Sequence, residues 1–252
     1  MAGDVTTELD DHIATVEFHR PPDNFFDVPL IDELAEAVLG LDDDPACRVV
    51  VLGSEGKNFC AGAQLGPDSG LVDQTADLYS HAVRLFSAKK PIVAAVQGAA
   101  VGGGLGLALA ADFRIATPDT RFRCNFARLG FHQGFGISVT LPAVVGQQRA
   151  LELLYTGGQV KGDEALRIGL ADRVVAIDEL RPTARAFAAE IAASGPLAVP
   201  AIKQTMRGDL AERIRAATAR EHEAQQALRA TEDFAEGVRA TAERRAPEFT
   251  GR

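Results

Sequence analysis

The chain has 252 residues, 46% of them hydrophobic, which is enough to bury one sizeable core and argues against a disordered protein. Its 26 basic and 35 acidic residues give a net charge of −9 without a sustained basic block, so neither nucleic acid nor a membrane surface is the expected partner. The three cysteines lack metal-type spacing and fit reduced thiols in a cytoplasmic protein. No signal-peptide pattern precedes the first elements.

Strands and helices alternate along the first two thirds of the chain. The pattern predicts a hairpin, then helix, strand, helix, strand and helix, over residues 5–18, 28–41, 48–52, 75–87, 92–96 and 103–111. Asp27 is suited to cap the first helix. The uncharged run from Pro91 to Ala111 is long enough to span a membrane, but its five glycines and Gln97 favour a strand, a turn and a helix.

After about Asp178 the pattern becomes entirely helical, with breaks at Gly195-Pro196 and near Gly208. Alternating strands and helices followed by helices alone predict an α/β fold with a helical C-terminal region. Helices this rich in alanine need a surface to pack against.

Two glycine-rich segments each follow a predicted buried strand, at residues 59–63 and 98–104. Small residues let a ligand approach the main chain closely, and Gly103 opens a predicted helix, so its N–H points outward at the positive end of the helix dipole. Two converging N–H groups polarise a carbonyl and stabilise an enolate. The segments therefore predict the two halves of an oxyanion hole.

Further motifs follow in a fixed order: Arg20-Pro21 before Asn24-Phe25-Phe26-Asp27, then residues 110–116, 164–171, 173–175 and 232–238. The ordered set resembles the crotonase (enoyl-CoA hydratase/isomerase) superfamily over nearly the whole chain. The resemblance implies a spiral core of ββα units in residues 1–193. It also implies a C-terminal helical region, residues 194–252, that builds a homotrimer, often paired into a hexamer as a dimer of trimers.

The resemblance also implies the ligand and its contacts. The backbone N–H groups of Ala63 and Gly103 would stabilise the enolate of an acyl-CoA thioester. CoA is then part of the substrate, and no separate cofactor or metal is expected. The residues implied to contact the substrate are Asn24, Phe25, Phe26, Ala61, Gly62, Gly102, Phe126, Gly134 and, in a neighbouring subunit's site, Phe234.

The acid and base of the hydratases are missing. The family places glutamates at the positions of Gly106 and Phe126, and neither residue here transfers a proton, so standard two-glutamate hydration is not expected. His132 is the local replacement, since an imidazole titrates near neutrality. The other interpretation is a histidine that only binds its loop or lines the acyl pocket. Tyr79 and His81 are expected to pack or to lie at the surface.

The leading hypothesis is an enzyme, a crotonase-superfamily lyase or isomerase acting on an acyl-CoA thioester. A non-catalytic acyl-CoA-binding protein and a hydrolase that cleaves a β-diketone are the alternatives. No complete dinucleotide fingerprint, phosphate loop, nucleophile elbow or zinc-protease motif occurs in the sequence.

Overall fold

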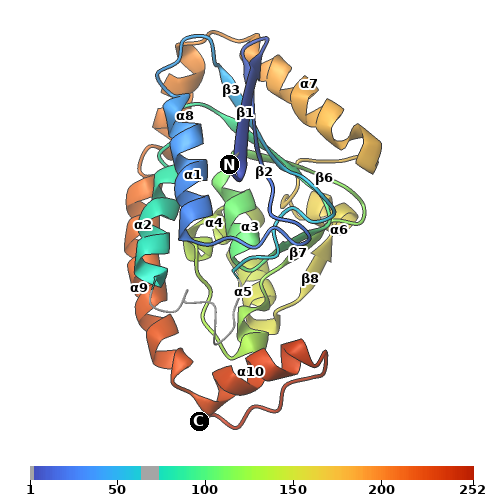
Figure 1. Ribbon diagram of the computed structural model, residues 1–252, viewed down its shortest axis with the longest axis vertical. Coiled ribbons are helices and arrows are strands. Elements are labelled where there is room, and N and C mark those ends of the chain that lie inside the picture. The colour runs from blue at the N-terminus through green and yellow to red at the C-terminus, as the bar shows by residue number, and fades with distance from the viewer. Residues whose placement is uncertain (1–2, 64–73) are drawn as a thin grey trace.

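The computed structural model describes residues 3–63 and 74–252 (Figure 1). The strands are β1 (Val5–Asp10), β2 (Ile13–Phe18), β3 (Val49–Ser54), β4 (Ile92–Val96), β5 (Ala99–Val101), β6 (Phe113–Ala116), β7 (Arg121–Arg123), β8 (Gln159–Lys161) and β9 (Arg173–Val174). The α-helices are α1 (Val28–Gly40), α2 (Thr75–Leu85), α3 (Gly103–Ala110), α4 (Ile137–Val145), α5 (Gln147–Thr156), α6 (Gly162–Arg167), α7 (Leu180–Ala192), α8 (Ala198–Arg207), α9 (Leu210–Arg229) and α10 (Glu232–Ala242). Two short 3₁₀ helices are η1 (Asn125–Leu129) and η2 (Ile177–Glu179).

The larger sheet has the order β1-β2-β3-β4-β6-β9, with β1 and β2 antiparallel and the remaining neighbours parallel. Every residue of β3 and β4 is buried, because layers of side chains cover both faces of the sheet. One face belongs to the main core with α1 and α3, and α7 packs on the other through Leu180, Ala184 and Ala188. A smaller sheet, β5-β7-β8, begins inside the second glycine segment, at β5.

Most of the predicted elements are confirmed. The hairpin, the strand at residues 92–96 and the helices starting near residues 28, 75 and 103 lie where the apolar pattern placed them. Asp27 caps α1, its Oδ1 accepting a hydrogen bond from Leu30 N at 3.0 Å. The run from Pro91 to Ala111 folds into β4, β5 and α3 as expected. In the described part of the chain, no helix is long and apolar enough to cross a membrane.

From α7 onward, the regular elements of the chain are all helices, as predicted. Figure 1 shows α9 running down one side of the molecule beside α2, with α10 crossing its lower end. Contacts of α9 with α2 and α4 attach this region to the core. The boundary near Ala193, the spiral of ββα units and the trimer stay predictions.

Candidate functional site

The two glycine segments lie side by side. Cys60 N donates a hydrogen bond to Ala99 O at 2.8 Å, and Val101 N donates one to Cys60 O at 3.1 Å, which makes a short parallel bridge. Gly62 has a φ of +96°, and a Cβ atom there would lie 2.7 Å from Val101 O and 3.5 Å from Gly103 N. Only glycine fits this left-handed position and close approach. The bridge therefore brings Gly62 up to the first turn of α3.

Two backbone N–H groups of these segments have no backbone acceptor among the described residues. Gly103 is the first residue of α3, where an N–H has no acceptor within the helix. Ala63 is paired with Phe26 in an isolated β-bridge, in which Phe26 N donates a hydrogen bond to Gly62 O at 3.0 Å. Among the described residues, neither Ala63 N nor Gly103 N donates to another backbone oxygen, whereas Gly102 N donates to Arg123 O at 2.9 Å.

Ala63 and Gly103 border one cavity of about 80 Å³. Most of its wall is apolar, and its polar side chains are Thr75, Tyr79, Asn125, Gln225 and Arg229. None of the described residues lining it is a carboxylate or a histidine. Its lining is formed by Phe26, Ala61, Gly62, Ala63, Thr75, Leu78, Tyr79, Val101, Gly102, Gly103, Asn125, Phe126, Leu129, Phe131, Gly134, Phe135, Gln225 and Arg229.

The cavity gathers eight of the predicted site residues from distant segments: Phe26, Ala61, Gly62, Ala63, Gly102, Gly103, Phe126 and Gly134. The other four, Asn24, Phe25, His132 and Phe234, do not line it. Phe25 points outward and is 37% exposed. Phe234 packs against Phe131 with ring centroids 4.7 Å apart, so it supports a lining residue from behind. The roles assigned to these residues stay predictions.

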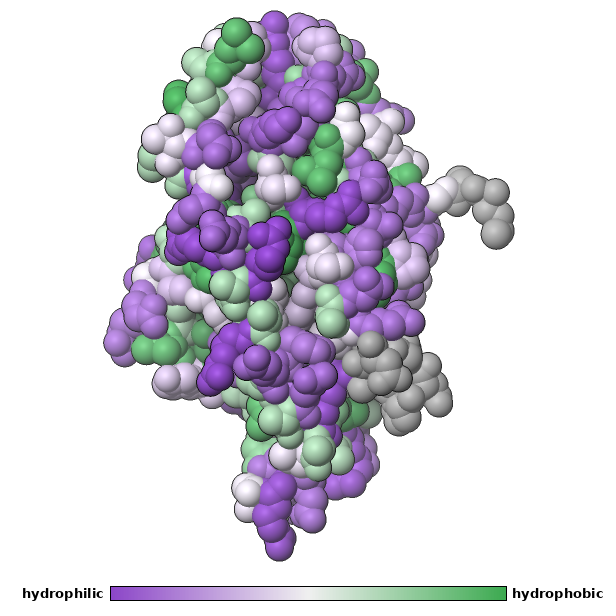
Figure 2. All heavy atoms as spheres, turned by 90° about the vertical axis from the view of Figure 1, so that its left-hand side faces the viewer, coloured by the Kyte–Doolittle hydropathy of each residue, from purple (hydrophilic) through white to green (hydrophobic). Residues whose placement is uncertain are grey.

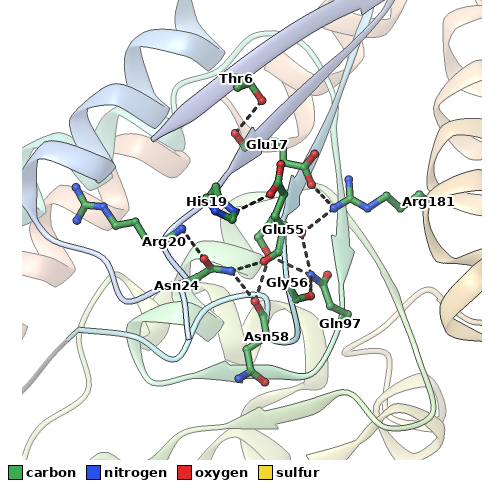
Figure 3. Close-up of polar contacts among 11 residues, drawn as sticks. Thr6, Glu17, His19, Arg20, Asn24, Glu55, Gly56, Asn58, Gln97 and Arg181 are labelled. Atoms are coloured by element: carbon green, nitrogen blue, oxygen red, sulfur yellow. Dashed lines mark hydrogen bonds and ion pairs between the residues drawn. The ribbon is translucent and has the colours of Figure 1, made fainter. Parts of the chain in front are cut away.

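Asn24 is fully buried and braces the loop that leads to Phe26. Its Nδ2 donates to Glu55 O at 2.8 Å and Asn58 O at 2.7 Å, and its Oδ1 accepts from Arg20 N at 2.7 Å. Figure 3 shows the side chain pointing at the Asn58 and Glu55 segment. These bonds use every proton of the amide nitrogen. Asn24 therefore holds the backbone beside the cavity.

His132 is partly buried in the loop after η1. Its Nδ1 lies 2.8 Å from Gln133 O, a contact that fits a histidine bound to its own loop. The ring is absent from the described cavity lining. This contact fits the loop-binding interpretation, and the proton-transfer role stays a prediction.

A buried polar network, missed by sequence reasoning, positions the loop that carries His132. Tyr79 Oη donates to Gln225 Oε1 at 2.9 Å, and Gln225 Nε2 donates to His132 O at 3.1 Å and Gln133 O at 3.3 Å. Tyr79 Oη lies against the Cα of Gly134, where a Cβ atom would overlap it. Burial raises the pKa of Tyr79, so the phenol is neutral and does not act as a base near pH 7.

Glu221, one helical turn before Gln225 on α9, extends the network to α4. Its carboxylate accepts hydrogen bonds from Gly136 N at 2.9 Å and Ser138 N at 3.1 Å, and burial raises its pKa. Glu221 and Gln225 are four residues apart and therefore share one face of α9. Because α9 carries polar and charged residues along most of its length, this spacing gives no signal in the sequence that these two residues are buried.

Other candidate residues have structural contacts. Cys60 is fully buried, and burial raises its pKa to about 12, so it is a thiol and not a thiolate. His81 Nδ1 lies 2.7 Å from Asp32 Oδ1. Asp112 accepts from Ile92 N at 2.8 Å and pairs with Lys203 at 2.9 Å, so its side chain joins β4 to α8.

Comparison with known proteins gives the family. The family model for enoyl-CoA hydratase/isomerase matches residues 8–252. The chain belongs to the enoyl-CoA hydratase/isomerase family. It is 35% identical to a crotonyl-CoA hydratase of Syntrophomonas wolfei over 97% of both chains, and 36% identical to a carnitinyl-CoA dehydratase of Proteus mirabilis over 92% of this chain and 93% of that one.

A solved structure of the family has the same fold. The crystal structure of an enoyl-CoA hydratase from Mycobacterium avium subsp. paratuberculosis superposes with a TM-score of 0.86 at 27% identity, covering 99% of this chain and 100% of the other. The expected membership of the family, inferred from the ordered motifs, is thereby confirmed.

The two positions where the resemblance implies a glutamate are filled by apolar contacts. A Cβ atom at Gly106 would lie 2.7 Å from Phe135 Cβ and 2.9 Å from two of its ring carbons. The Phe126 ring lines the cavity, with its Cζ 3.6 Å from the place of a Cβ at Gly102. The space beside the N-terminus of α3 is therefore occupied by phenyl rings.

Proposed function

We propose that this chain binds an acyl-CoA thioester and polarises its carbonyl with the backbone N–H groups of Ala63 and Gly103. The observation that carries the proposal is the cavity in which both groups lie, next to the bridge between the two glycine segments. The relatives named as hydratase and dehydratase of CoA thioesters support the choice of ligand. CoA belongs to the substrate, and the proposal needs no separate cofactor or metal.

The proposed chemistry is stabilisation of negative charge on the thioester oxygen. When a proton leaves the carbon next to the carbonyl, or a nucleophile adds to a conjugated double bond, the electron pair moves onto that oxygen. Two N–H donors already in place bind the enolate more tightly than the neutral carbonyl, and one such donor contributes roughly 3 kcal/mol in comparable sites. The dipole of α3 adds to the effect at Gly103.

Standard hydration is not part of the proposal. Hydration needs a positioned acid and base, and each contributes roughly 10²–10⁴-fold. Gly106 and Phe126 supply neither, so crotonyl-CoA is expected to be hydrated several orders of magnitude more slowly than by a two-glutamate enzyme. His132 is the proposed proton-transfer group, and it would have to rotate away from Gln133 O to reach the cavity.

A non-catalytic acyl-CoA-binding protein is the second candidate. It is favoured by the lining of the cavity, which offers no carboxylate or imidazole among the described residues. Cleavage of a β-diketone stays a prediction without an observation of its own in its favour.

A panel of acyl-CoA thioesters, scored for binding by calorimetry and for products by mass spectrometry, tests the proposal. Binding of at least one thioester more tightly than free CoA is expected. Conversion identifies an enzyme, and binding without conversion identifies the binding protein. If no member of the panel binds, the assignment of the cavity is wrong.

We also propose assembly as a homotrimer or hexamer, in a cytoplasmic setting. The support for assembly is an exposed apolar surface near α8, where Leu197, Ile202 and Met206 are 87%, 61% and 75% exposed. Figure 2 shows the side of the molecule that carries α8 and α9, with green hydrophobic groups among the purple hydrophilic surface. Three buried free thiols, Cys47, Cys60 and Cys124, suit a reducing compartment. Sedimentation analysis is expected to show no monomer at micromolar concentration.

A further inference from the structure

Four phenyl rings surround the cavity, those of Phe26, Phe126, Phe131 and Phe135. We infer that the cavity takes a planar aromatic acyl group, as in an aryl-CoA thioester, and that Phe135 is a residue that sets this specificity. The inference rests on the proposed function, because it names the acyl group of the thioester that the cavity is proposed to bind.

The rings lie directly against the segment that carries the proposed donor. A Cβ atom at Gly103 would overlap the ring of Phe26, and a Cβ atom at Gly106 would lie 2.7 Å from Phe135 Cβ. Phe126 is less tightly placed: its Cζ lies 3.6 Å from the place of a Cβ atom at Gly102, an ordinary van der Waals contact. If Gly103 N binds the carbonyl of an acyl group, the atoms next to that carbonyl therefore contact aromatic side chains.

Packing fixes the rings before any ligand arrives. Phe135 is 1% exposed, and its ring centroid lies 5.4 Å from that of Phe26 and 6.4 Å from that of Phe86. Phe131 is held on its other side by Phe234, at 4.7 Å. Because these rings have no freedom left to lose, binding a flat ligand among them carries little ordering cost.

The backbone of Phe135 is a second, independent observation. Its φ is +59°, in the left-handed region that bulky residues rarely occupy, and glycines flank it at Gly134 and Gly136. A glycine at this position would avoid the strain but would leave the wall without its ring. Strained backbone of this kind is concentrated at ligand sites, where the surrounding structure holds it in place.

Aromatic walls distinguish aromatic from saturated ligands of the same size. Edge-to-face and offset contacts between rings stabilise a complex beyond the effect of the buried area. The extra stabilisation corresponds to about three- to tenfold tighter binding. Benzoyl-CoA and cyclohexanecarbonyl-CoA form a matched pair, since both acyl groups are six-membered carbon rings attached to the same thioester. The expected preference is therefore about three- to tenfold for benzoyl-CoA.

Calorimetric titration of the full chain with both thioesters and with free CoA tests the inference. Phe135→Leu keeps an apolar side chain but removes the ring, and it is expected to abolish the preference. Phe113→Leu is the control. Phe113 forms an aromatic pair with Phe187 on the face of the larger sheet that α7 covers, away from the cavity. This substitution should leave the preference unchanged. Phe126→Leu provides a second cavity variant should Phe135→Leu unfold.

Equal affinity of the wild type for both thioesters, with each tighter than free CoA, overturns the aromatic preference and leaves the proposed function standing. A preference that persists in a folded Phe135→Leu, or in Phe126→Leu where Phe135→Leu does not fold, overturns the role of the rings. Failure of both thioesters to bind more tightly than free CoA, while another member of the thioester panel binds, overturns the aromatic preference. Failure of every member of the panel contradicts the proposed function itself.

Discussion

Replacing Gly106 with alanine tests the contact between Gly106 and Phe135. Gly106 stands where the resembled family has a glutamate, and the Phe135 side chain fills the space beside it. The new Cβ atom would lie 2.7 Å from Phe135 Cβ, and that atom is attached to the backbone and has little room to move. Overpacking of this kind costs about 1–3 kcal/mol. Alanine in a helix interior regains about 1 kcal/mol over glycine. We therefore expect Gly106→Ala to destabilise the protein by about 0–2 kcal/mol.

The effect of Gly106→Ala on the free energy of unfolding should change sign when Phe135 is replaced by glycine. Phe135→Gly removes the opposing Cβ atom and the positive-φ strain, at a cost of about 3–5 kcal/mol for the lost ring. In that background Gly106→Ala meets no ring and is expected to stabilise by about 1 kcal/mol. Urea denaturation of the four proteins gives the coupling energy, which should be about 1–3 kcal/mol. An equal effect of Gly106→Ala in both backgrounds would refute the contact as the reason for glycine.

Three further predictions concern the Asn24 side chain, the ion pair between Glu236 and Arg245, and His132. Asn24→Ala removes the side-chain donor to Glu55 O and one of the two side-chain donors to Asn58 O, the other being Ser54 Oγ at 3.3 Å, and should destabilise by about 1–3 kcal/mol in urea denaturation; an unchanged midpoint would contradict the structural role of the Asn24 side chain. The Arg245 hydrogen bond lowers the pKa of Glu236 to about 2, so the stability from this pair is present above the ordinary carboxyl pKa and is lost as pH falls toward 2. Glu236→Gln should therefore flatten the fall in stability between about pH 5 and 2, and a wild-type slope in acid denaturation would show that the pair does not stabilise the fold. If the wild type converts a thioester, His132→Ala should abolish turnover while calorimetric binding is kept, and an unchanged rate would remove His132 from the mechanism.

The sequence predicted the elements well where a periodic apolar pattern or a local signal determines them. The hairpin follows from alternation, β4 from an unbroken apolar run and α1 from one apolar helix face. The Asp27 cap follows from a side chain that binds its own helix. The two glycine segments were also found, because small residues after buried strands are a local signal. Their neighbourhood in space then follows from the parallel order of β3 and β4.

The cavity wall could not be predicted, because it depends on contacts between distant segments. Tyr79 and Gln225 are 146 positions apart and meet only when α9 packs on α2. Asn24 was assigned to the ligand because the resembled motif includes it, and no local pattern showed that its amide binds carbonyl oxygens of the segment after β3. No local pattern shows that Phe135 fills the space beside Gly106, since their contact requires α3 and the loop before α4 to be packed together.

The central claim is that two backbone N–H groups polarise a thioester carbonyl. Infrared spectroscopy of an acyl-CoA carrying ¹³C at that carbonyl, recorded free and bound to the wild-type protein, tests it most directly. Hydrogen bonds from Ala63 N and Gly103 N weaken the double bond, so the bound carbonyl should absorb at a lower frequency than the free thioester in water. A bound thioester whose carbonyl frequency is unchanged or raised would contradict the oxyanion hole.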